Sequence, residues 1–180
     1  MSSMKVQKGF LLFLVMLGFS NPTWASGSSN LTIQKFLQVT PDIYRGGRPT
    51  DADLKSIESQ YKIHSVVDLE DDTKVVDSEQ TGADAIGLSF LPTPMNPYSK
   101  PTDNEINGVL AELQNTSNFP LFIHCHYGED RTGLLIGLYR VEVQGWAADK
   151  AYQEMLANGF HPALKGLDAY FRNRTGYTGK

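Results

Sequence analysis

The stretch His-Cys-His-Tyr-Gly-Glu-Asp-Arg-Thr-Gly occupies residues 124–133, and we call it the cysteine loop. An apolar run over 119–123 precedes it and another over 134–143 follows it. This layout predicts a strand, a tight loop and a helix. Cys125 is the only cysteine in the 180-residue chain, and five residues separate it from Arg131. A nucleophile and a fixed positive charge therefore stand close together on one loop.

The surroundings of Cys125 favour the thiolate, which is the nucleophilic form of a cysteine. The loop leads into a helix N-terminus, whose partial positive charge stabilises an anion. Arg131 adds a full positive charge, and we expect the Thr132 hydroxyl to donate a hydrogen bond to the sulfur. The alternative is an inert buried cysteine.

The residues between Cys125 and Arg131 act mainly through their backbone. A short loop that curls before a helix directs several N–H groups into one concavity, which binds an anion. We expect Gly128 to supply a left-handed backbone there and Gly133 to allow close packing behind the loop. Arg131 can hold two phosphate oxygens with its planar guanidinium group. The predicted substrate-binding residues of the loop are His126, Tyr127, Gly128, Glu129, Asp130 and Thr132. This arrangement suits in-line attack on phosphorus and a phosphocysteine intermediate.

Strands and helices alternate along the chain. We predict strands near 31–39, 43–45, 63–69, 88–91 and 119–123. We predict helices near 51–60, 75–86, 132–143, 146–156 and 164–171, with one more opened by the capping-box pattern Thr-Asp-Asn-Glu at 102–105. The pattern indicates an α/β fold with a mainly parallel central sheet flanked by helices. In such sheets ligands bind at the carboxyl ends of strands, where the cysteine loop lies.

The N-terminal segment predicts export. Two lysines precede an apolar run over 9–19, and small residues stand at 23 and 25, as at a signal-peptidase site. The run is shorter than the roughly 20 residues of a membrane span, so we expect no stable membrane association after cleavage. We therefore expect a signal peptide over 1–25 and a single domain over 26–180 that is periplasmic or secreted. An uncleaved anchor is the alternative.

The composition of the chain limits the kinds of binding partner that we expect. The net charge is −4 and the sequence has no block of Lys and Arg, so nucleic acid is not an expected partner. We expect a monomer that needs no metal and no organic cofactor. Three other interpretations of the cysteine loop are a metal site, a sulfur-transferring loop of the rhodanese type, and a phosphate-binding module without catalysis. The first lacks a second Cys/His cluster, and the second typically has one residue fewer before its arginine.

The pattern His124-Cys125-x-x-Gly128-x-x-Arg131-Thr132-Gly133 resembles the loop of cysteine-dependent protein tyrosine and dual-specificity phosphatases. Other segments resemble exported bacterial dual-specificity phosphatases: 42–49, 65–69, 91–92, 139–140 and 144–146. The segment 101–110 and the loop are also similar to tyrosine-phosphatase-like inositol polyphosphatases (phytases). The resemblance implies a dual-specificity-phosphatase-like fold and phosphomonoester hydrolysis, on phosphotyrosine-type proteins or on inositol polyphosphates such as phytate.

The resemblance also implies an aspartate that protonates the leaving oxygen, located within 93–98. This window holds no acid, and Asn96 stands at the implied position. Asp103 is the nearest substitute, and we expect it to be the general acid, although an acidic residue in a first helical turn is often only structural. Glu129 and Asp130 are further candidates.

Substrate specificity depends on the flanking loops. Arg48 and Lys100, each next to a proline, are predicted to contact substrate phosphates, and Arg45 is a further candidate. The substrate class, phosphotyrosine or inositol phosphate, stays open at this point. A phosphate-binding module with weak catalysis is the alternative function.

Overall fold

The computed structural model describes residues 31–179. Within them one sheet has the strand order β1-β2-β5-β3-β4. Its strands are β1 (Leu37–Thr40), β2 (Ile43–Gly46), β3 (Ser65–Asp68), β4 (Ser89–Pro92) and β5 (Leu121–His124). Only β1 runs antiparallel to its neighbour, at the edge of the sheet. The predicted α/β fold with a mainly parallel sheet is confirmed.

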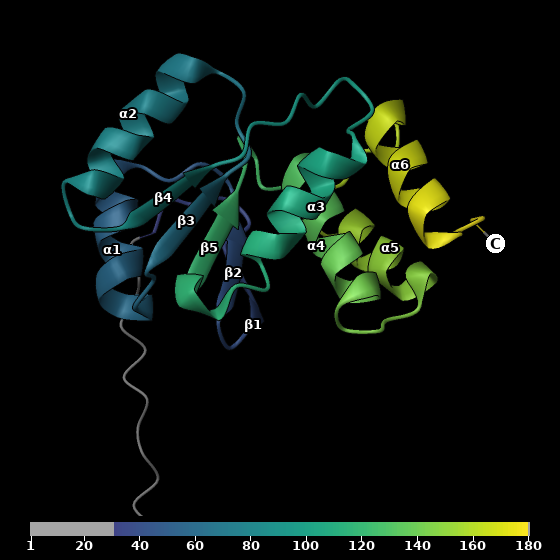
Figure 1. Ribbon diagram of the computed structural model, residues 1–180, viewed down its shortest axis with the longest axis horizontal. Helices are drawn as coiled ribbons and strands as arrows, with labels where there is room; N and C mark the ends of the chain where they lie inside the picture. The colour runs from purple at the N-terminus through teal and green to yellow at the C-terminus, as the bar shows by residue number, and fades with distance from the viewer. Residues whose placement is uncertain (1–30, 180) are drawn as a thin grey trace, which may run out of the picture.

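Helices cover both faces of the sheet, as Figure 1 shows. One face carries α1 (Asp51–Tyr61) and α2 (Thr73–Asp84), and the other carries α3 (Asp103–Glu112), α4 (Asp130–Glu142), α5 (Ala148–Ala157) and α6 (Lys165–Thr175). Each face has its own buried apolar cluster, the larger one under α3 to α6. Helix α4 is buried along most of its length, which explains why its sequence is apolar on nearly all sides.

The predicted helix near 51–60 and the predicted helix start at Thr102 are confirmed. Thr50 and Thr102 each cap their helix in a capping box, with Asp53 as the partner in α1 and Glu105 in α3. The prediction of a strand over 31–39 is wrong for most of its length, because only Leu37–Thr40 is a strand. Within the preceding segment Ile33 is buried in the smaller cluster, so burial explains its apolar character.

The parallel register brings the site together. His124 at the end of β5 lies opposite Gly46 of β2 and Asp68 of β3. The residues that follow these three strands therefore meet at one edge of the sheet. The cysteine loop follows the central strand β5 and lies in the middle of this edge.

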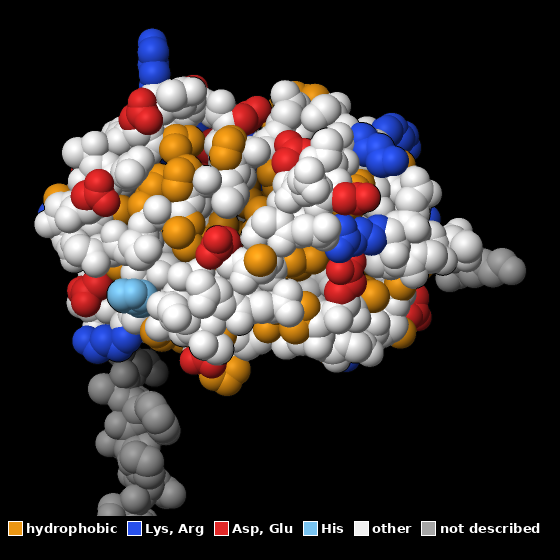
Figure 2. All heavy atoms as spheres, viewed as in Figure 1, with side chains coloured by type: hydrophobic (Ala, Val, Ile, Leu, Met, Phe, Trp, Pro, Cys, Tyr) orange, Lys and Arg blue, Asp and Glu red, His pale blue; other side chains and the backbone are white. Residues whose placement is uncertain are grey.

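The surface carries both apolar and charged regions. Figure 2 shows apolar side chains gathered over α2 and β4 on the face seen in Figure 1, with acidic side chains around them. No helix within residues 31–179 has the length and apolar character to cross a membrane. The predicted signal peptide over 1–25 lies outside the described residues.

Candidate active site

A pocket of about 820 Å³ lies over the cysteine loop at the carboxyl edge of the sheet. Its wall includes Cys125, which is 3% exposed, and Arg131. The other lining residues come from five segments: Arg48; Glu70, Asp71, Asp72 and Val75; Pro97 and Tyr98; His126, Tyr127 and Asp130; and His161, Ala163 and Leu164. We call this the active-site pocket.

The backbone of the cysteine loop forms the expected concavity. Within residues 31–179 the N–H groups of residues 126–129 donate no hydrogen bond, and the first turn of α4 follows them directly. Gly128 has φ +71°, which confirms the predicted left-handed backbone. A Cβ at Gly128 would lie 2.3 Å from the carbonyl carbon of Gly46, so the loop packs tightly on the end of β2. A Cβ at Gly133 would meet Phe160 at 3.6 Å, an ordinary contact, so the predicted close packing at Gly133 is wrong.

Arg45 supports the loop from below. Its guanidinium is buried, and Nη2 donates a 2.5 Å hydrogen bond to the carbonyl oxygen of Gly128. Burial lowers the pKa of Arg45, opposed by the charges of Glu154 and Cys125. Arg45 was a candidate for a substrate phosphate, but the structure places it beneath the loop, outside the pocket lining.

Arg131 is fixed at one end of its guanidinium. Nη1 donates hydrogen bonds to the carbonyl oxygens of Leu69 and Met95 and contacts Oδ1 of Asp71 at 3.0 Å. The side chain is largely buried, yet it lines the pocket. Within the described chain Nε and Nη2 make no hydrogen bond, so they are the donors left for an anion.

Arg48, a predicted phosphate contact, lines the pocket, but it is not a free cation. Its Nε and Nη2 each lie 2.5 Å from a carboxylate oxygen of Glu70, and Nη2 lies 2.8 Å from Nδ1 of His126. Burial alone would raise the pKa of Glu70, but hydrogen bonding to Arg48 lowers it overall. This pairing neutralises much of the charge that Arg48 would offer to a phosphate.

A buried charged group lies beneath the loop. Nε2 of His124 lies 2.7 Å from Oε1 of Glu79 and 3.7 Å from Oδ1 of Asp68. Burial alone would lower the pKa of His124, but Glu79 and then Asp68 raise it overall. Burial raises the pKa of Asp68 to about 6, opposed by the charge of His124.

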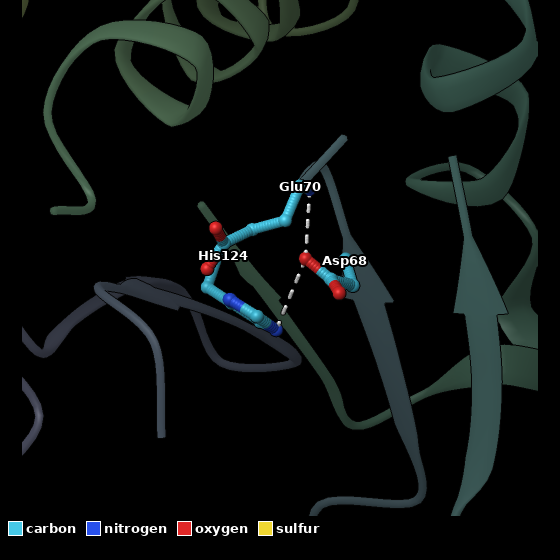
Figure 3. A group of neighbouring side chains, drawn as sticks. All are labelled: Asp68, Glu70 and His124. Carbon is cyan, nitrogen blue, oxygen red and sulfur yellow. Dashed lines mark hydrogen bonds and ion pairs between the residues drawn. The ribbon is translucent and has the colours of Figure 1, made fainter. Parts of the chain in front are cut away.

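Figure 3 shows the imidazole of His124 and the carboxylate of Asp68 turned toward each other, while Oδ1 of Asp68 also accepts the backbone N–H of Glu70. Ligand atoms of these three residues lie within 4.8 Å of one another. Glu70 is already paired with Arg48, and His124 with Glu79. We therefore interpret the group as an ion-pair network beneath the loop.

Asp103 is not brought to the active-site pocket. Its carboxylate is 79% exposed, accepts a hydrogen bond from the hydroxyl of Tyr170 and faces Arg174. It lines a different pocket, together with Lys100. Helix α3 begins at Asp103 and packs toward α4 and α6, which holds this residue away from Cys125. The prediction of Asp103 as the general acid and of Lys100 as a phosphate contact therefore does not agree with the geometry.

The remaining predictions have mixed outcomes. The hydroxyl of Thr132 is buried but has no hydrogen-bond partner within residues 31–179, so the expected bond to sulfur is not made. Glu129 is turned toward Lys35, with 3.6 Å between Oε1 and Nζ, and is not part of the pocket lining. His126, Tyr127 and Asp130, which were predicted to bind substrate, line the pocket that contains Cys125.

Sequence reasoning missed several pocket residues. His161 lies 36 positions after Cys125, yet its backbone N–H and its ring both contact the carboxylate of Asp130. Glu70 and Asp71 follow β3 at the carboxyl edge of the sheet. Because ligands bind at this edge of a parallel sheet, their position in the sequence could have indicated that they belong to the site. His161 follows a turn between two helices, which gives no comparable signal. Glu129, Asp130 and His161 also lie close together, but Lys35 and the hydrogen bonds just described account for this grouping.

Comparisons agree with this geometry. A model described as the tyrosine phosphatase family matches residues 30–163. The dual specificity protein phosphatase TpbA of Pseudomonas aeruginosa is 30% identical over 159 residues, which cover 84% of this chain and 67% of TpbA. The inositol diphosphatase DSP5 of Arabidopsis thaliana is 30% identical over 125 residues, which cover 66% of this chain and 59% of DSP5.

The fold has solved counterparts. The crystal structure of P. aeruginosa TpbA in complex with pTyr has a TM-score of 0.65 at 26% identity and covers 81% of this chain and 84% of that one. The catalytic core of the PP-IP phosphatase SIW14 from Saccharomyces cerevisiae has the same fold, with a TM-score of 0.65 at 22% identity and coverage of 77% and 86%. The chain belongs to the tyrosine phosphatase family and is a cysteine-dependent phosphatase.

Proposed function

We propose that this phosphatase hydrolyses aryl phosphate monoesters of the phosphotyrosine type through a phosphocysteine on Cys125. The main support for this proposal is the balance of charges among the residues that line the active-site pocket. Two arginines, Arg48 and Arg131, face four carboxylates, Glu70, Asp71, Asp72 and Asp130. This balance suits one phosphoryl group held by the cysteine loop better than a ligand with many phosphates.

The rest of the lining is apolar or aromatic. These lining residues include Val75, Pro97, Tyr98, Tyr127 and Leu164. Tyr98 and Tyr127 are among the exposed large hydrophobic side chains of the described residues. An aromatic leaving group stacks on such side chains and buries apolar surface against them. Support also comes from TpbA, whose crystal structure contains pTyr.

The proposed reaction uses the parts in order. The backbone N–H groups of residues 126–129 and the free end of Arg131 bind the equatorial oxygens of the phosphoryl group. The thiolate of Cys125 attacks phosphorus from the floor of the pocket, and the bond to the ester oxygen breaks. Water then attacks the phosphocysteine and releases phosphate. Arg45 and the His124–Glu79 pair hold the loop in shape throughout.

A substrate panel tests the proposal. The purified protein is assayed for phosphate release from a phosphotyrosine peptide, phytate and a diphosphoinositol polyphosphate, with Cys125→Ser as the control. We expect kcat/KM to be highest for the phosphotyrosine peptide and all turnover to be lost in the variant. A preference for phytate or the diphosphoinositol would refute the proposed substrate class. No turnover by the unaltered protein would favour the phosphate-binding module.

Inositol phosphates, phytate included, are the second candidate. Relatives in plants and yeast are inositol diphosphatases. A further pocket of about 380 Å³ adjoins the first through Arg48 and carries Lys74, a place for a second phosphate. The pairing of Arg48 with Glu70 weakens this candidate, because the shared cation is already neutralised.

We further propose that residues 1–25 are a signal peptide, that the domain over 26–180 acts in the periplasm or outside the cell, and that it is a monomer. The support is the pattern of lysines, apolar run and small residues. N-terminal sequencing of the protein from the periplasmic fraction should begin at Ser26, and its mass in solution should be that of one chain. An uncleaved N-terminus at Met1, or a stable dimer, would contradict this.

A further inference from the structure

The reaction lacks an assigned proton donor. When the ester bond breaks, the leaving oxygen needs a proton unless it belongs to an acidic alcohol or phenol. The window over 93–98 contains no acid. There Asn96 uses its Oδ1 to accept the backbone N–H of Tyr98, and Asp103 lines another pocket. A donor must therefore come from another element that lines the active-site pocket.

The turn between α5 and α6 brings a histidine to this pocket. His161 donates its backbone N–H to Oδ1 of Asp130 at 2.7 Å, and its ring Nδ1 lies 3.2 Å from both carboxylate oxygens of Asp130. Asp130 opens α4 directly after the cysteine loop. Backbone and ring of His161 are thus both tied to the element that positions Cys125.

Two neighbours hold the turn in place. Phe160 is buried and packs near Gly133 of α4. Gly159 has φ +92°, and a Cβ there would lie 2.6 Å from Oε1 of Glu129, so the turn approaches the cysteine loop closely. The chain then turns through a hydrogen bond from the N–H of Leu164 to the carbonyl oxygen of His161. His161 is therefore held by its neighbours on both sides.

We propose that His161 is the general acid of this phosphatase, with Asp130 as its positioning residue. Because Asp130 accepts from Nδ1, the second ring nitrogen, Nε2, is the one left to face the substrate, and it has no hydrogen-bond partner within residues 31–179. The ring is 61% exposed and lines the same pocket as Cys125 and Arg131. A carboxylate that fixes one nitrogen of a histidine and leaves the other for proton transfer is a common arrangement in catalysis.

The proton inventory of the proposed steps balances. The thiolate of Cys125 forms the S–P bond while the P–O ester bond breaks, and the leaving oxygen takes the Nε2 proton of the His161 imidazolium. The neutral ring then accepts a proton from the water that attacks the phosphocysteine. The S–P bond breaks, phosphate leaves, and the thiolate and the imidazolium are both restored. The inference rests on the proposed phosphocysteine route and not on the proposed preference for phosphotyrosine.

Two other pocket residues are less suited to this role. Asp71 contacts Nη1 of Arg131 at 3.0 Å, so it serves as the partner of the cation that binds phosphate. His126 faces Nη2 of Arg48 through its Nδ1 at 2.8 Å. The same nitrogen lies 3.8 Å from Oε2 of Glu70, but that carboxylate already accepts from Nε and Nη2 of Arg48. The ring of His161, in contrast, contacts the carboxylate of Asp130, which no arginine engages within residues 31–179.

A leaving-group series tests the inference. His161→Asn, Asp71→Asn and the unaltered protein are assayed on a dinitrophenyl phosphate, whose phenol leaves without help, and on phosphotyrosine, whose phenol has a pKa of about 10. We expect His161→Asn to lower kcat on phosphotyrosine roughly 100-fold and on the dinitrophenyl ester less than about 5-fold, with KM nearly unchanged. His64→Asn is the control, because His64 is exposed and comes just before β3, at the opposite edge of the sheet from the pocket.

Each other outcome has a defined meaning. The inference is overturned if His161→Asn loses kcat equally on both esters or loses none. It is also overturned if Asp71→Asn, instead of His161→Asn, loses kcat on phosphotyrosine alone. If the unaltered protein turns over its substrates, each of these three outcomes contradicts the role of His161 but not the proposed function. No turnover of either ester by the unaltered protein contradicts the proposed function and the inference together.

Discussion

Nη2 of Arg45 on β2 donates a 2.5 Å hydrogen bond to the carbonyl oxygen of Gly128, the residue that turns the cysteine loop. The guanidinium is buried, so the bond forms where water does not compete for the carbonyl. The carbonyl points down to Arg45 while neighbouring N–H groups are left to line the pocket. The shape of the anion site thus depends on a residue outside the loop.

Replacing Arg45 should therefore impair catalysis without touching the substrate. Lysine keeps the positive charge but lacks the planar group that reaches Gly128. We expect Arg45→Lys to lower kcat/KM on an aryl phosphate by about 10-fold and to weaken competitive inhibition by inorganic phosphate to a similar degree. Wild-type values for both would show that the bond to Gly128 does not shape the site.

Gly128 should tolerate no side chain. Alanine would have to adopt φ +71° and would place its Cβ 2.3 Å from the carbonyl carbon of Gly46. We expect Gly128→Ala to lose at least 100-fold in kcat/KM and to lower the melting temperature. Gly108→Ala is the matched control, because nothing lies within 4 Å of its added Cβ in α3. This control should keep full activity and gain about 0.5–1 kcal/mol of stability. Similar behaviour of the two variants would contradict the geometry of the loop.

The His124–Glu79 pair should make stability depend on pH. Because Glu79 and Asp68 raise the pKa of His124 overall, the fold prefers the charged ring. This contribution is fully present below the unfolded pKa of about 6.5 and is lost as pH rises through the higher folded pKa. We expect Glu79→Gln to cost about 3 kcal/mol near pH 6 and clearly less near pH 9, measured by urea unfolding.

Asp77→Asn is the control for this measurement, since Asp77 is exposed on the same helix. It should change stability by less than about 0.5 kcal/mol at either pH. If Glu79→Gln lowers the free energy of unfolding by the same amount at both pH values, the charged form of His124 does not stabilise the fold.

Asp103 should be dispensable for the reaction. Its contacts are with Tyr170 and Arg174, away from the active-site pocket. We expect Asp103→Asn to keep kcat and KM within about twofold on both good and poor leaving groups. It should cost less than about 1 kcal/mol of stability, as is usual for exposed pairs. A selective loss on phosphotyrosine would instead restore Asp103 as the acid.

The local part of the fold could be predicted from the sequence because its signals are short-range. Thr50 and Thr102 each meet an acidic residue three positions on, so both helix starts follow from capping geometry. The need for a glycine at 128 follows from the tight turn before α4. The segment before Leu37 misled the prediction, because its apolar residues pack against the core without pairing in the sheet.

The site could be predicted only as far as the loop itself extends. Cys125 and Arg131 are close in sequence, so their spacing already indicates phosphoryl chemistry. The partners of Arg48 and the approach of His161 depend on how helices and strands far apart in sequence pack together. The prediction of Asp103 relied on distance along the chain, whereas α3 directs that side chain toward α6.

The most direct test of the central claim is to look for phosphate on the sulfur. The protein is mixed with a phosphotyrosine peptide, quenched in acid within milliseconds and analysed by peptide mass spectrometry. We predict a phosphoryl group on Cys125 that appears before free phosphate and is absent in Cys125→Ser, which should have no turnover. Hydrolysis by Cys125→Ser at the unaltered rate would contradict the account.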